Sequence, residues 1–239
     1  MSDARELYDK LWSEQWGDLQ RFGPEHRHRR RVVRHLLAQL EYDSVADIGC
    51  GSGQNLAIAC EGRKLRRAVG TDLSSRALEL AAARHPAEYR VLDIENDALP
   101  EQFDLVTCLE VIEHIRDDAK AMANMARMTG RWLLLGTVQG TMAEHEREIG
   151  HFRNYTRAGL EALVRGAGLS PVTVVEWGFP FYSPVFRAIQ AKLPSPHGVA
   201  AGKYGTGLKV MAQAMYLLYF LNSWRRGDLI FVLARAGAG

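Results

Sequence analysis

The stretch "VADIGCGSG" (45–53) decides the fold, because an apolar strand pattern leads straight into a glycine-rich turn. The glycines occupy alternate positions, Gly49, Gly51 and Gly53. Glycine accepts positive φ and lets a ligand approach the main chain closely. A dinucleotide fingerprint would read G-x-G-x-x-G, whereas this turn reads D-x-G-x-G-x-G from Asp47. A nicotinamide-dependent oxidoreductase is therefore disfavoured.

Strand-like and helical patterns alternate along the chain from this turn onward. Strands are expected at 44–49, 67–72, 88–94, 103–109, 131–138, 171–177 and 228–236. Helices are expected at 54–62, 75–85, 117–128 and 156–169, with Ser74 or Ser75 and Thr156 as N-caps and Gly168 after the last of them. Strands that are apolar on both faces and alternate with helices predict an α/β fold: a Rossmann-like, doubly wound sheet of seven strands.

The chain divides into three predicted regions. Residues 1–44 form an N-terminal helical segment, and residues 45–177 with 228–236 form the core. Residues 178–227 form a helical cap, inserted before the last strand and placed over the acceptor site. We expect its apolar segment "VMAQAMYLLYFL" (210–221) to be a buried helix lining an apolar pocket, and the polar stretch 141–155 to be a loop over the site.

Composition sets the class of protein. The chain has 239 residues, 47% of them hydrophobic and 24% charged, with a net charge of +2, which calls for no polyanionic partner. The three cysteines form no C-x-x-C pair, so we expect a reducing, cytoplasmic setting. The charged N-terminus does not resemble a secretory signal, and no apolar run reaches the roughly 18 residues of a transmembrane helix. The oligomeric state is left open.

Two further carboxylates follow strands whose carboxyl ends should meet at one edge of the sheet. Asp72 ends the second strand in "VGTD", where it could accept hydrogen bonds from a ribose diol, and Asp93 ends the third strand in "RVLDI", near where an adenine amino group could donate. Ligands of open α/β sheets bind at the carboxyl ends of the strands. The joint placement of the glycine turn and the two aspartates therefore predicts a nucleoside site.

These segments together resemble the class I S-adenosylmethionine (SAM)-dependent methyltransferases, in particular the ubiquinone-pathway O-methyltransferases and the type 11 group. The motifs match in order and spacing: "VADIGCGSG" (45–53), "GTDLS" (70–74), "VLDIE" (91–95) and "FDLVTCLEVIEHI" (103–115). The match covers roughly residues 30–176 and the last strand. The resemblance implies SAM as cofactor and a set of cofactor-binding residues: Asp47, the glycines Gly49, Gly51 and Gly53 beside the methionine portion, Asp72 at the ribose, Leu73, Asp93 and Ile94 at the adenine, Leu109, and Arg29 at the cofactor carboxylate.

A cluster of acid/base groups follows the fourth strand. Glu110, Glu113 and His114 stand at i, i+3 and i+4, which would place them on one side of a helical turn. With His151 they resemble the metal site of ubiquinone-type O-methyltransferases and of small-RNA 2′-O-methyltransferases, which implies Mg²⁺ or another divalent cation. In the alternative without a metal, the glutamates and the histidine shape the pocket, and His114 or His151 acts as general base with Glu113 beside it.

The resemblance implies methyl transfer, with a hydroxyl or an amine as the acceptor group. The apolar cap (178–226) predicts that the acceptor is a small, partly apolar or lipid-like molecule. An RNA methyltransferase is one alternative, because "HRHRRR" (26–31) could bind phosphates, but a solvated helix is the preferred interpretation and nucleic acid is disfavoured. Peripheral contact of 207–226 with a membrane is another alternative to its burial. A non-catalytic cofactor-binding module also stays open, since fold alone does not settle function.

Overall fold

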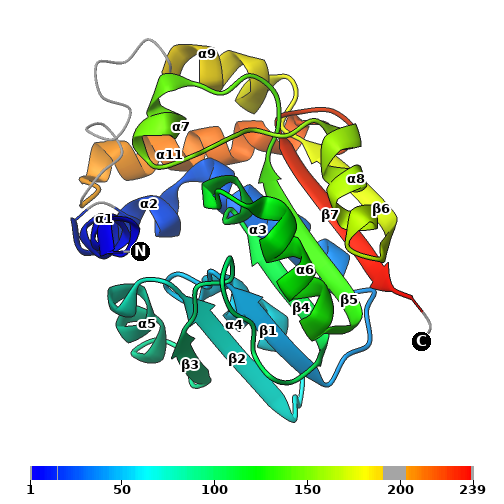
Figure 1. Cartoon of the computed structure of the whole chain (residues 1–239). Coiled ribbons are helices and arrows are strands. Elements are labelled where there is room, and N and C mark those ends of the chain that lie inside the picture. The colour runs from blue at the N-terminus through cyan, green and yellow to red at the C-terminus, as the bar shows by residue number, and fades with distance from the viewer. Residues whose placement is uncertain (1, 15, 191–202, 238–239) are drawn as a thin grey trace.

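A computed structural model describes residues 2–14, 16–190 and 203–237. It contains one seven-stranded sheet with the order β3-β2-β1-β4-β5-β7-β6 (Figure 1). β7 runs antiparallel to β5 and β6, and the other neighbours pair in parallel. The strands are β1 (Ser44–Ile48), β2 (Arg67–Asp72), β3 (Glu88–Val91), β4 (Phe103–Leu109), β5 (Thr129–Val138), β6 (Leu169–Trp177) and β7 (Leu229–Ala236). The predicted doubly wound fold is confirmed.

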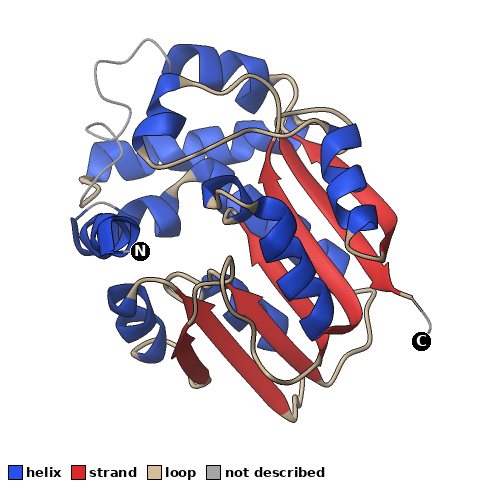
Figure 2. Ribbon diagram, in the orientation of Figure 1, coloured by secondary structure: helices blue, strands red, loops and turns tan. Residues whose placement is uncertain are grey.

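Helices cover both faces of the sheet, as Figure 2 shows. Within the core they are α4 (Gln54–Cys60), α5 (Ser75–Ala82), α6 (Asp118–Met128), α7 (Glu144–Glu148) and α8 (Arg157–Gly166), with the short 3₁₀ helix η1 (Ile112–His114). The N-terminal segment forms α1 (Ser2–Glu14), α2 (Trp16–Phe22) and α3 (Pro24–Leu37). The insertion before β7 contains η2 (Phe181–Phe186), α9 (Arg187–Gln190), α11 (Thr206–Leu218) and η3 (Tyr219–Leu221).

Two apolar cores, one on each face of the sheet, account for the strand pattern. β1 is buried at all five of its positions, which is why its sequence shows no polar alternation. Ala46 and Ile48 face the core that contains α6 and α8, whereas Val45 faces the core that contains α3 and α4. A central parallel strand therefore fixes the position at which the glycine turn leaves the sheet.

Helix caps follow the local sequence. Ser74 accepts a hydrogen bond from Ala77 N at 3.1 Å and caps α5, and Thr156 accepts from Gly159 N at 3.1 Å and caps α8. Gly168 has a φ of +83° directly after the C-cap of α8, the left-handed geometry that glycine accepts most easily. These predicted boundaries are confirmed.

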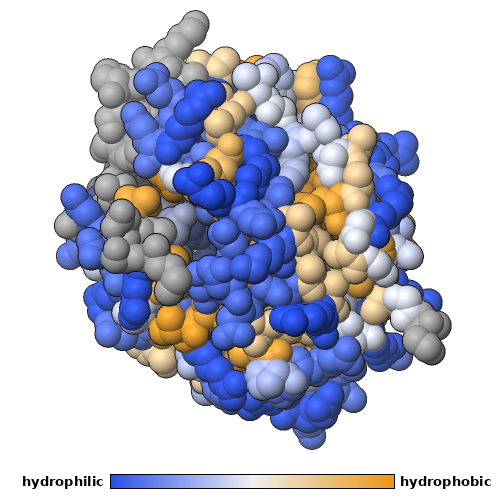
Figure 3. Space-filling model, in the orientation of Figure 1, coloured by the Kyte–Doolittle hydropathy of each residue, from blue (hydrophilic) through white to orange (hydrophobic). Residues whose placement is uncertain are grey.

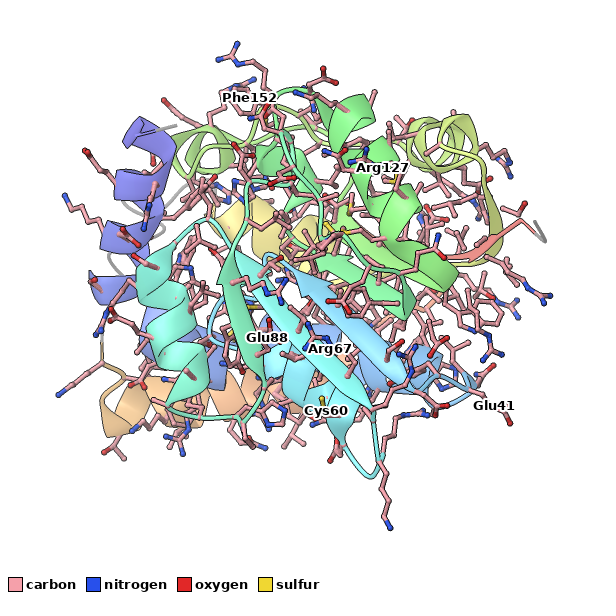
Figure 4. All side chains as sticks on the ribbon, turned by 60° about the horizontal axis from the view of Figure 1, so that its bottom comes forward. Glu41, Cys60, Arg67, Glu88, Arg127 and Phe152 are labelled. Atoms are coloured by element: carbon pink, nitrogen blue, oxygen red, sulfur yellow. The ribbon has the colours of Figure 1, made fainter. Side chains whose placement is uncertain are left out.

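The edge of the sheet at β3 carries charged side chains that form ion pairs. Arg67 of β2 pairs with Glu88 of the neighbouring β3, and the two side chains lie together in Figure 4. Arg67 Nη2 also pairs with Glu101 at 2.7 Å. Charged side chains on an edge strand discourage pairing with a further strand. The β3 edge is a different part of the sheet from the carboxyl ends of the strands, where the cavities lie.

Three local predictions were wrong. The third strand ends at Val91, so Asp93 follows it in a turn instead of ending it. The stretch 141–155 is only partly a loop, because 144–148 form α7. The cap helix is not buried. Ala212 is the single buried residue of α11, and one face of this helix is exposed to solvent.

The molecular surface is mixed. The face drawn in Figure 3 is largely hydrophilic, with apolar residues scattered over it. None of the described helices is long and apolar enough to cross a membrane.

Candidate active site

The glycine turn after β1 lets side chains from other elements approach the backbone. Gly49 and Gly51 have φ of +67° and +52°, in the left-handed region. A Cβ at Gly49 would come within 2.2 Å of a Val111 methyl carbon, and one at Gly51 within 2.4 Å of the Trp12 ring. The positions therefore need glycine for both conformation and space.

Asp72 holds this turn from the end of β2. Its Oδ2 accepts a hydrogen bond from Gly51 N at 2.9 Å, and its Oδ1 accepts one from Ser74 N at 2.9 Å. Burial raises the pKa of Asp72 to about 6, against the opposing effect of these backbone donors. The carboxylate lines a cavity of about 470 Å³, which we call the Asp72 cavity; Leu73, Asp93 and Ile94 also line it. Four predicted nucleoside-binding residues are thus brought to one cavity.

A second cavity of about 580 Å³ lies under the insertion, and we call it the cap cavity. Leu109 and His151 line it, together with apolar and aromatic side chains of the insertion, Tyr182, Phe186, Leu208, Met211 and Met215. The two cavities meet, because five residues line both: Trp12, Trp16, Gly49, Glu110 and His114. A ligand in the Asp72 cavity can therefore reach a second ligand in the cap cavity.

Two predicted cofactor-binding residues line neither cavity. Asp47 is only 1% exposed and accepts a hydrogen bond from Thr107 Oγ1 at 2.6 Å; burial raises its pKa to about 7. Gly53 is the N-cap residue of α4, and a Cβ there would lie 3.1 Å from Ala81 Cβ. Asp47 and Gly53 therefore lie behind the turn, where their contacts are with Thr107 and α5.

Glu113, His114 and His151 come together at the junction of β4 and the stretch before α8. One potential ligand atom from each lies within 4.8 Å of the others. The two imidazole centroids are 4.5 Å apart, in an edge-to-face arrangement. A backbone bond from Phe152 N to Glu113 O, at 2.9 Å, ties the stretch with His151 to η1. The fourth strand and the segment after the fifth thus meet as predicted from the topology.

The electrostatics of this cluster favour neutral groups. The Glu113 side chain is fully buried, and burial raises its pKa well above the usual range, with the Glu110 carboxylate adding to the effect. Thr137 lies near enough to favour the ionised form, yet neither Glu113 oxygen meets the geometry of a hydrogen bond. Burial lowers the pKa of His114 to about 3, and it also lowers the pKa of His151. At neutral pH both imidazoles are therefore unprotonated, which leaves their ring nitrogens free to bind a cation but weakens them as proton acceptors.

Glu110 does not join this cluster, contrary to the prediction of one helical face. It precedes η1 with a φ of +59°, and its Oε2 pairs with Arg29 Nη2 at 2.8 Å. The Glu110 N–H donates to Gly136 O at 2.8 Å, which fixes the turn at the end of β4. Arg29 lines the cap cavity and so lies near the glycine turn, as expected, but its guanidinium is held by Glu110.

Sequence reasoning missed the aromatic residues of the N-terminal helices. Tyr8, Trp12 and Trp16 line the cavities, and the Tyr8 ring lies edge-to-face with His114 at 5.7 Å. Asp9 accepts hydrogen bonds from Ser74 Oγ and from Arg76 N, which fastens α1 to the start of α5. The signal was present in the sequence, since the three aromatic residues recur at i, i+4 and i+8.

Comparison with known proteins identifies the domain. Residues 46–131 match the methyltransferase-domain family. This part of the chain is similar to methyltransferase domains. The chain is 30% identical over 146 residues to the ubiquinone biosynthesis O-methyltransferase of Nitrosomonas europaea. This alignment covers 56% of this chain and 61% of the relative. It is 32% identical over 149 residues to that of Thiobacillus denitrificans, covering 57% of this chain and 63% of the relative. The alignments thus span less than two thirds of these relatives.

Solved structures show the same fold for the methyltransferase domain and its additions. The N-methyltransferase NodS of Bradyrhizobium japonicum, in complex with S-adenosylhomocysteine, superposes with a TM-score of 0.66 at 16% identity, covering 98% of this chain and 99% of that one. Magnesium protoporphyrin IX methyltransferase of Synechocystis superposes with a TM-score of 0.57 at 15% identity, covering 93% and 91%. The [4+2]-cyclase SpnF has a TM-score of 0.57 as well, at 17% identity, covering 89% and 82%. The resemblance to class I methyltransferases is confirmed, whereas the acceptor is not given by the fold.

Proposed function

We propose that this protein is a SAM-dependent methyltransferase that acts on a hydroxyl group of a small, partly apolar acceptor. The observation that carries the proposal is the meeting of the two cavities at Glu110 and His114, beside the Glu113–His114–His151 cluster. Adenosine of the cofactor would occupy the Asp72 cavity, which leaves the reactive end of the cofactor at this junction. The acceptor would then approach from the cap cavity.

The residues present fit the cofactor. Asp72 offers two carboxylate oxygens beside a glycine turn whose backbone is open to a ligand. Asp93 and Ile94 supply one polar and one apolar contact for a base. SAM, when bound, supplies a methyl group that its sulfonium charge has already activated. The chain must therefore orient the acceptor, remove its proton and exclude water.

His114 and His151 are both neutral at physiological pH because burial lowers the pKa of each ring. With a pKa of about 3, His114 is a weak base, so His151 is the better candidate for proton removal. Asn154 holds the His151 ring through its Nδ1, with the amide oxygen at 3.3 Å. Glu113 lies beside both rings, so a positive charge that develops on either of them has a carboxyl group close by. The fully buried position of Glu113 also keeps water away from the transfer step.

A divalent cation also fits this cluster. Both Glu113 oxygens and His114 Nδ1 are buried without a hydrogen-bond partner in the described part of the chain. Held by Glu113, His114 and His151, such a cation would lower the pKa of an acceptor hydroxyl. Hydroxyl rather than amine acceptors are supported by this donor set and by the O-methyltransferase names of the relatives.

The apolar lining of the cap cavity supports an acceptor with a hydrophobic part. The test is to incubate the protein with methyl-labelled SAM and a fractionated cell extract. We expect label in the organic-soluble fraction, in an ether product. Label that appears in RNA alone would exclude a small acceptor and favour the RNA methyltransferase, and an absence of calorimetric binding of SAM and of S-adenosylhomocysteine would refute the cofactor.

Chelation separates the two hydroxyl mechanisms. If a cation activates the acceptor, EDTA should abolish turnover and added Mg²⁺ or Zn²⁺ should restore it. If a histidine alone takes the proton, turnover should survive chelation but fall at acid pH. Turnover that resists EDTA and yields an N-methyl product would instead establish an amine acceptor.

A further inference from the structure

Exposed apolar side chains gather on the insertion. Eight of the eleven large hydrophobic residues that are exposed in the described part of the chain lie between 178 and 226. Three others, Val91, Phe152 and Val172, lie on separate elements. Scattered exposed hydrophobics are ordinary, whereas a contiguous group marks an interaction surface. The eight residues are Val185, Ile189, Val210, Met211, Leu217, Leu218, Phe220 and Leu221.

The group centres on the outer face of α11. Val210, Leu217 and Leu221 follow i, i+7 and i+11 spacing and are 65%, 59% and 69% exposed. The opposite side of the helix carries buried Ala212 and also Leu208, which lines the cap cavity. α11 is therefore apolar on the side that faces the protein and on the side that faces solvent. We call Val210, Met211, Leu217, Leu218 and Leu221 the α11 face.

Basic side chains lie beside the α11 face. Residues 178–226 contain no Asp or Glu. Arg187 is held in ion pairs with Glu146 and Asp228, and the exposed cations that the structure describes in this range are Lys203, Lys209, Arg225 and Arg226. Lys209 and Arg225 are exposed beside the apolar group. The guanidinium of Arg31, from α3, lies 4.2 Å from the centroid of the exposed Phe220 ring. An apolar centre with a cationic rim is complementary to an anionic lipid surface.

We propose that the α11 face docks on an anionic lipid bilayer. The apolar side chains would enter the headgroup–acyl boundary, and the surrounding cations would contact lipid phosphates. Self-association through this face is disfavoured because it would bring the exposed cations of two copies, Lys209 and Arg225 among them, close together. A nucleic acid would need cations at the centre of the face, where the side chains are apolar.

Docking would also place the opening of the cap cavity at the membrane. Ile189 and Met211 are 54% and 49% exposed, and both line the cavity. If the proposed function holds, a lipid-like acceptor could pass from the bilayer to the methyl-transfer site without crossing water. This last step rests on the proposed function, whereas bilayer docking does not.

Vesicle flotation tests the docking. The whole chain is mixed with phosphatidylcholine vesicles, with or without phosphatidylglycerol, in the absence of SAM and acceptor. We expect binding to the anionic vesicles that weakens as the salt concentration rises. Leu217→Glu with Leu218→Glu should lower binding about tenfold or more, and so should Lys209→Glu with Arg225→Glu. Val172→Glu, at a similarly exposed valine of β6, is the matched control and should bind like the parent protein.

Far-UV circular dichroism of each variant reports folding independently of SAM binding, so that loss of vesicle binding is interpreted only for folded proteins. No binding of the parent protein to anionic vesicles would overturn the proposal, and so would an equal loss in Val172→Glu. A dimer that Leu217→Glu dissociates, with no vesicle binding, would assign the face to a second copy instead. Vesicle binding without any methyl transfer would leave the docking intact and refute only the proposed function.

Discussion

Glu110 adopts a left-handed backbone conformation, which costs a residue with a Cβ about 1–2 kcal/mol. In the described chain it is the sole non-glycine residue with positive φ. Strain of this kind persists where surrounding contacts over-determine it, and here the Arg29 ion pair and the Gly136 carbonyl do so. Because the pair lies where the cavities meet, a bound cofactor must either contact it or replace one of its partners.

Asp72 offers a sharp test of cofactor binding at the residue level. Asp72→Ala removes a carboxylate expected to accept ribose hydroxyls, each charge-assisted bond being worth about 1.5–3 kcal/mol. We therefore expect the Kd for S-adenosylhomocysteine to rise at least tenfold in calorimetry. Asp43→Ala, at an exposed aspartate just before β1, is the control and should not change the Kd. An unchanged Kd in a folded Asp72→Ala protein would place the ribose elsewhere.

Glu113 tests the acid/base cluster. Glu113→Gln keeps the shape of the side chain but removes the group that can ionise when a cation or a protonated imidazole lies beside it. We expect kcat/KM to fall about 10²–10⁴-fold, the range for a group active in proton transfer. The Kd for SAM should change little, because the cofactor residues are intact. Glu144→Gln, at an exposed position of α7, should retain full activity; a loss of equal size there would point to a general effect of charge.

At the scale of elements, α1 closes the cofactor site. Its Trp12 ring lies against Gly51, and Asp9 anchors the helix to Ser74 and Arg76. These contacts join the first helix to the turns after β1 and β2. Tyr8 and Trp12 of α1 thus form part of the wall of the Asp72 cavity.

Trp12→Ala removes the ring that α1 places over the turn. We expect the Kd for SAM to rise roughly tenfold, which corresponds to about 1.4 kcal/mol, because a wall shared by both cavities is lost. Trp224→Ala, which removes a tryptophan that lies edge-to-face with His35 and lines neither cavity, is the matched control. Equal affinity in the two variants would mean that α1 does not contact the cofactor.

The packing of α3 on α11 depends on a buried neutral histidine. His28 is fully buried, its Nε2 donates to Tyr216 O at 2.8 Å, and its ring stacks on Trp177 with centroids 5.0 Å apart. Burial lowers the pKa of His28 to about 4 from 6.5. Protonation would place an unpaired charge between two helices, and this contact therefore couples pH to the cap.

The sign of the pH effect follows from that shift. Between pH 6.5 and 4 the unfolded chain binds the His28 proton and the folded chain does not, so the free energy of unfolding falls as the pH decreases through this window. The contribution is complete above pH 6.5 and amounts to at most about 3 kcal/mol. His28→Phe should remove this part of the pH dependence in urea titrations. His35→Phe, at an exposed position of α3, should keep it.

At the scale of the whole molecule, every part of the site lies at the carboxyl ends of the parallel strands. The turns after β1, β2 and β4 supply Gly49, Asp72 and Glu110, and the additions before β1 and before β7 cover them (Figure 1). Neither cavity is enclosed by the methyltransferase core alone. A ligand that bridges core, N-terminal helices and insertion should therefore stabilise the molecule as a unit.

Thermal unfolding measures that linkage. A ligand that binds only the folded state at 100 times its Kd adds about 2.7 kcal/mol of stability. We expect S-adenosylhomocysteine to raise the Tm of the parent protein progressively with concentration, and to raise that of Asp72→Ala much less. NAD⁺ at the same concentrations should leave Tm unchanged, because the turn lacks the dinucleotide spacing. A larger shift with NAD⁺ than with S-adenosylhomocysteine would contradict the assigned cofactor.

The sequence by itself determined those features of the fold that depend on interactions between residues close together in the chain. The strands, the glycine turn at Gly49 and Gly51, and the cap residues Ser74 and Thr156 follow from local sterics and hydrogen bonding, which act within a few positions of the chain. The placement of Asp72 was also predictable, since the parallel order of the strands brings their carboxyl ends to one edge.

Tertiary structure decided which of the candidate groups meet. Spacing placed Glu110 with Glu113 and His114, but packing of α3 supplied Arg29 as its partner and left Glu113 with His151. Contacts between segments far apart in the sequence depend on how whole elements pack, and the periodicity of the sequence does not predict that packing. Periodicity likewise showed that α11 is apolar, yet whether an apolar face is covered depends on what else the chain can place against it, and here the described chain leaves one face in solvent.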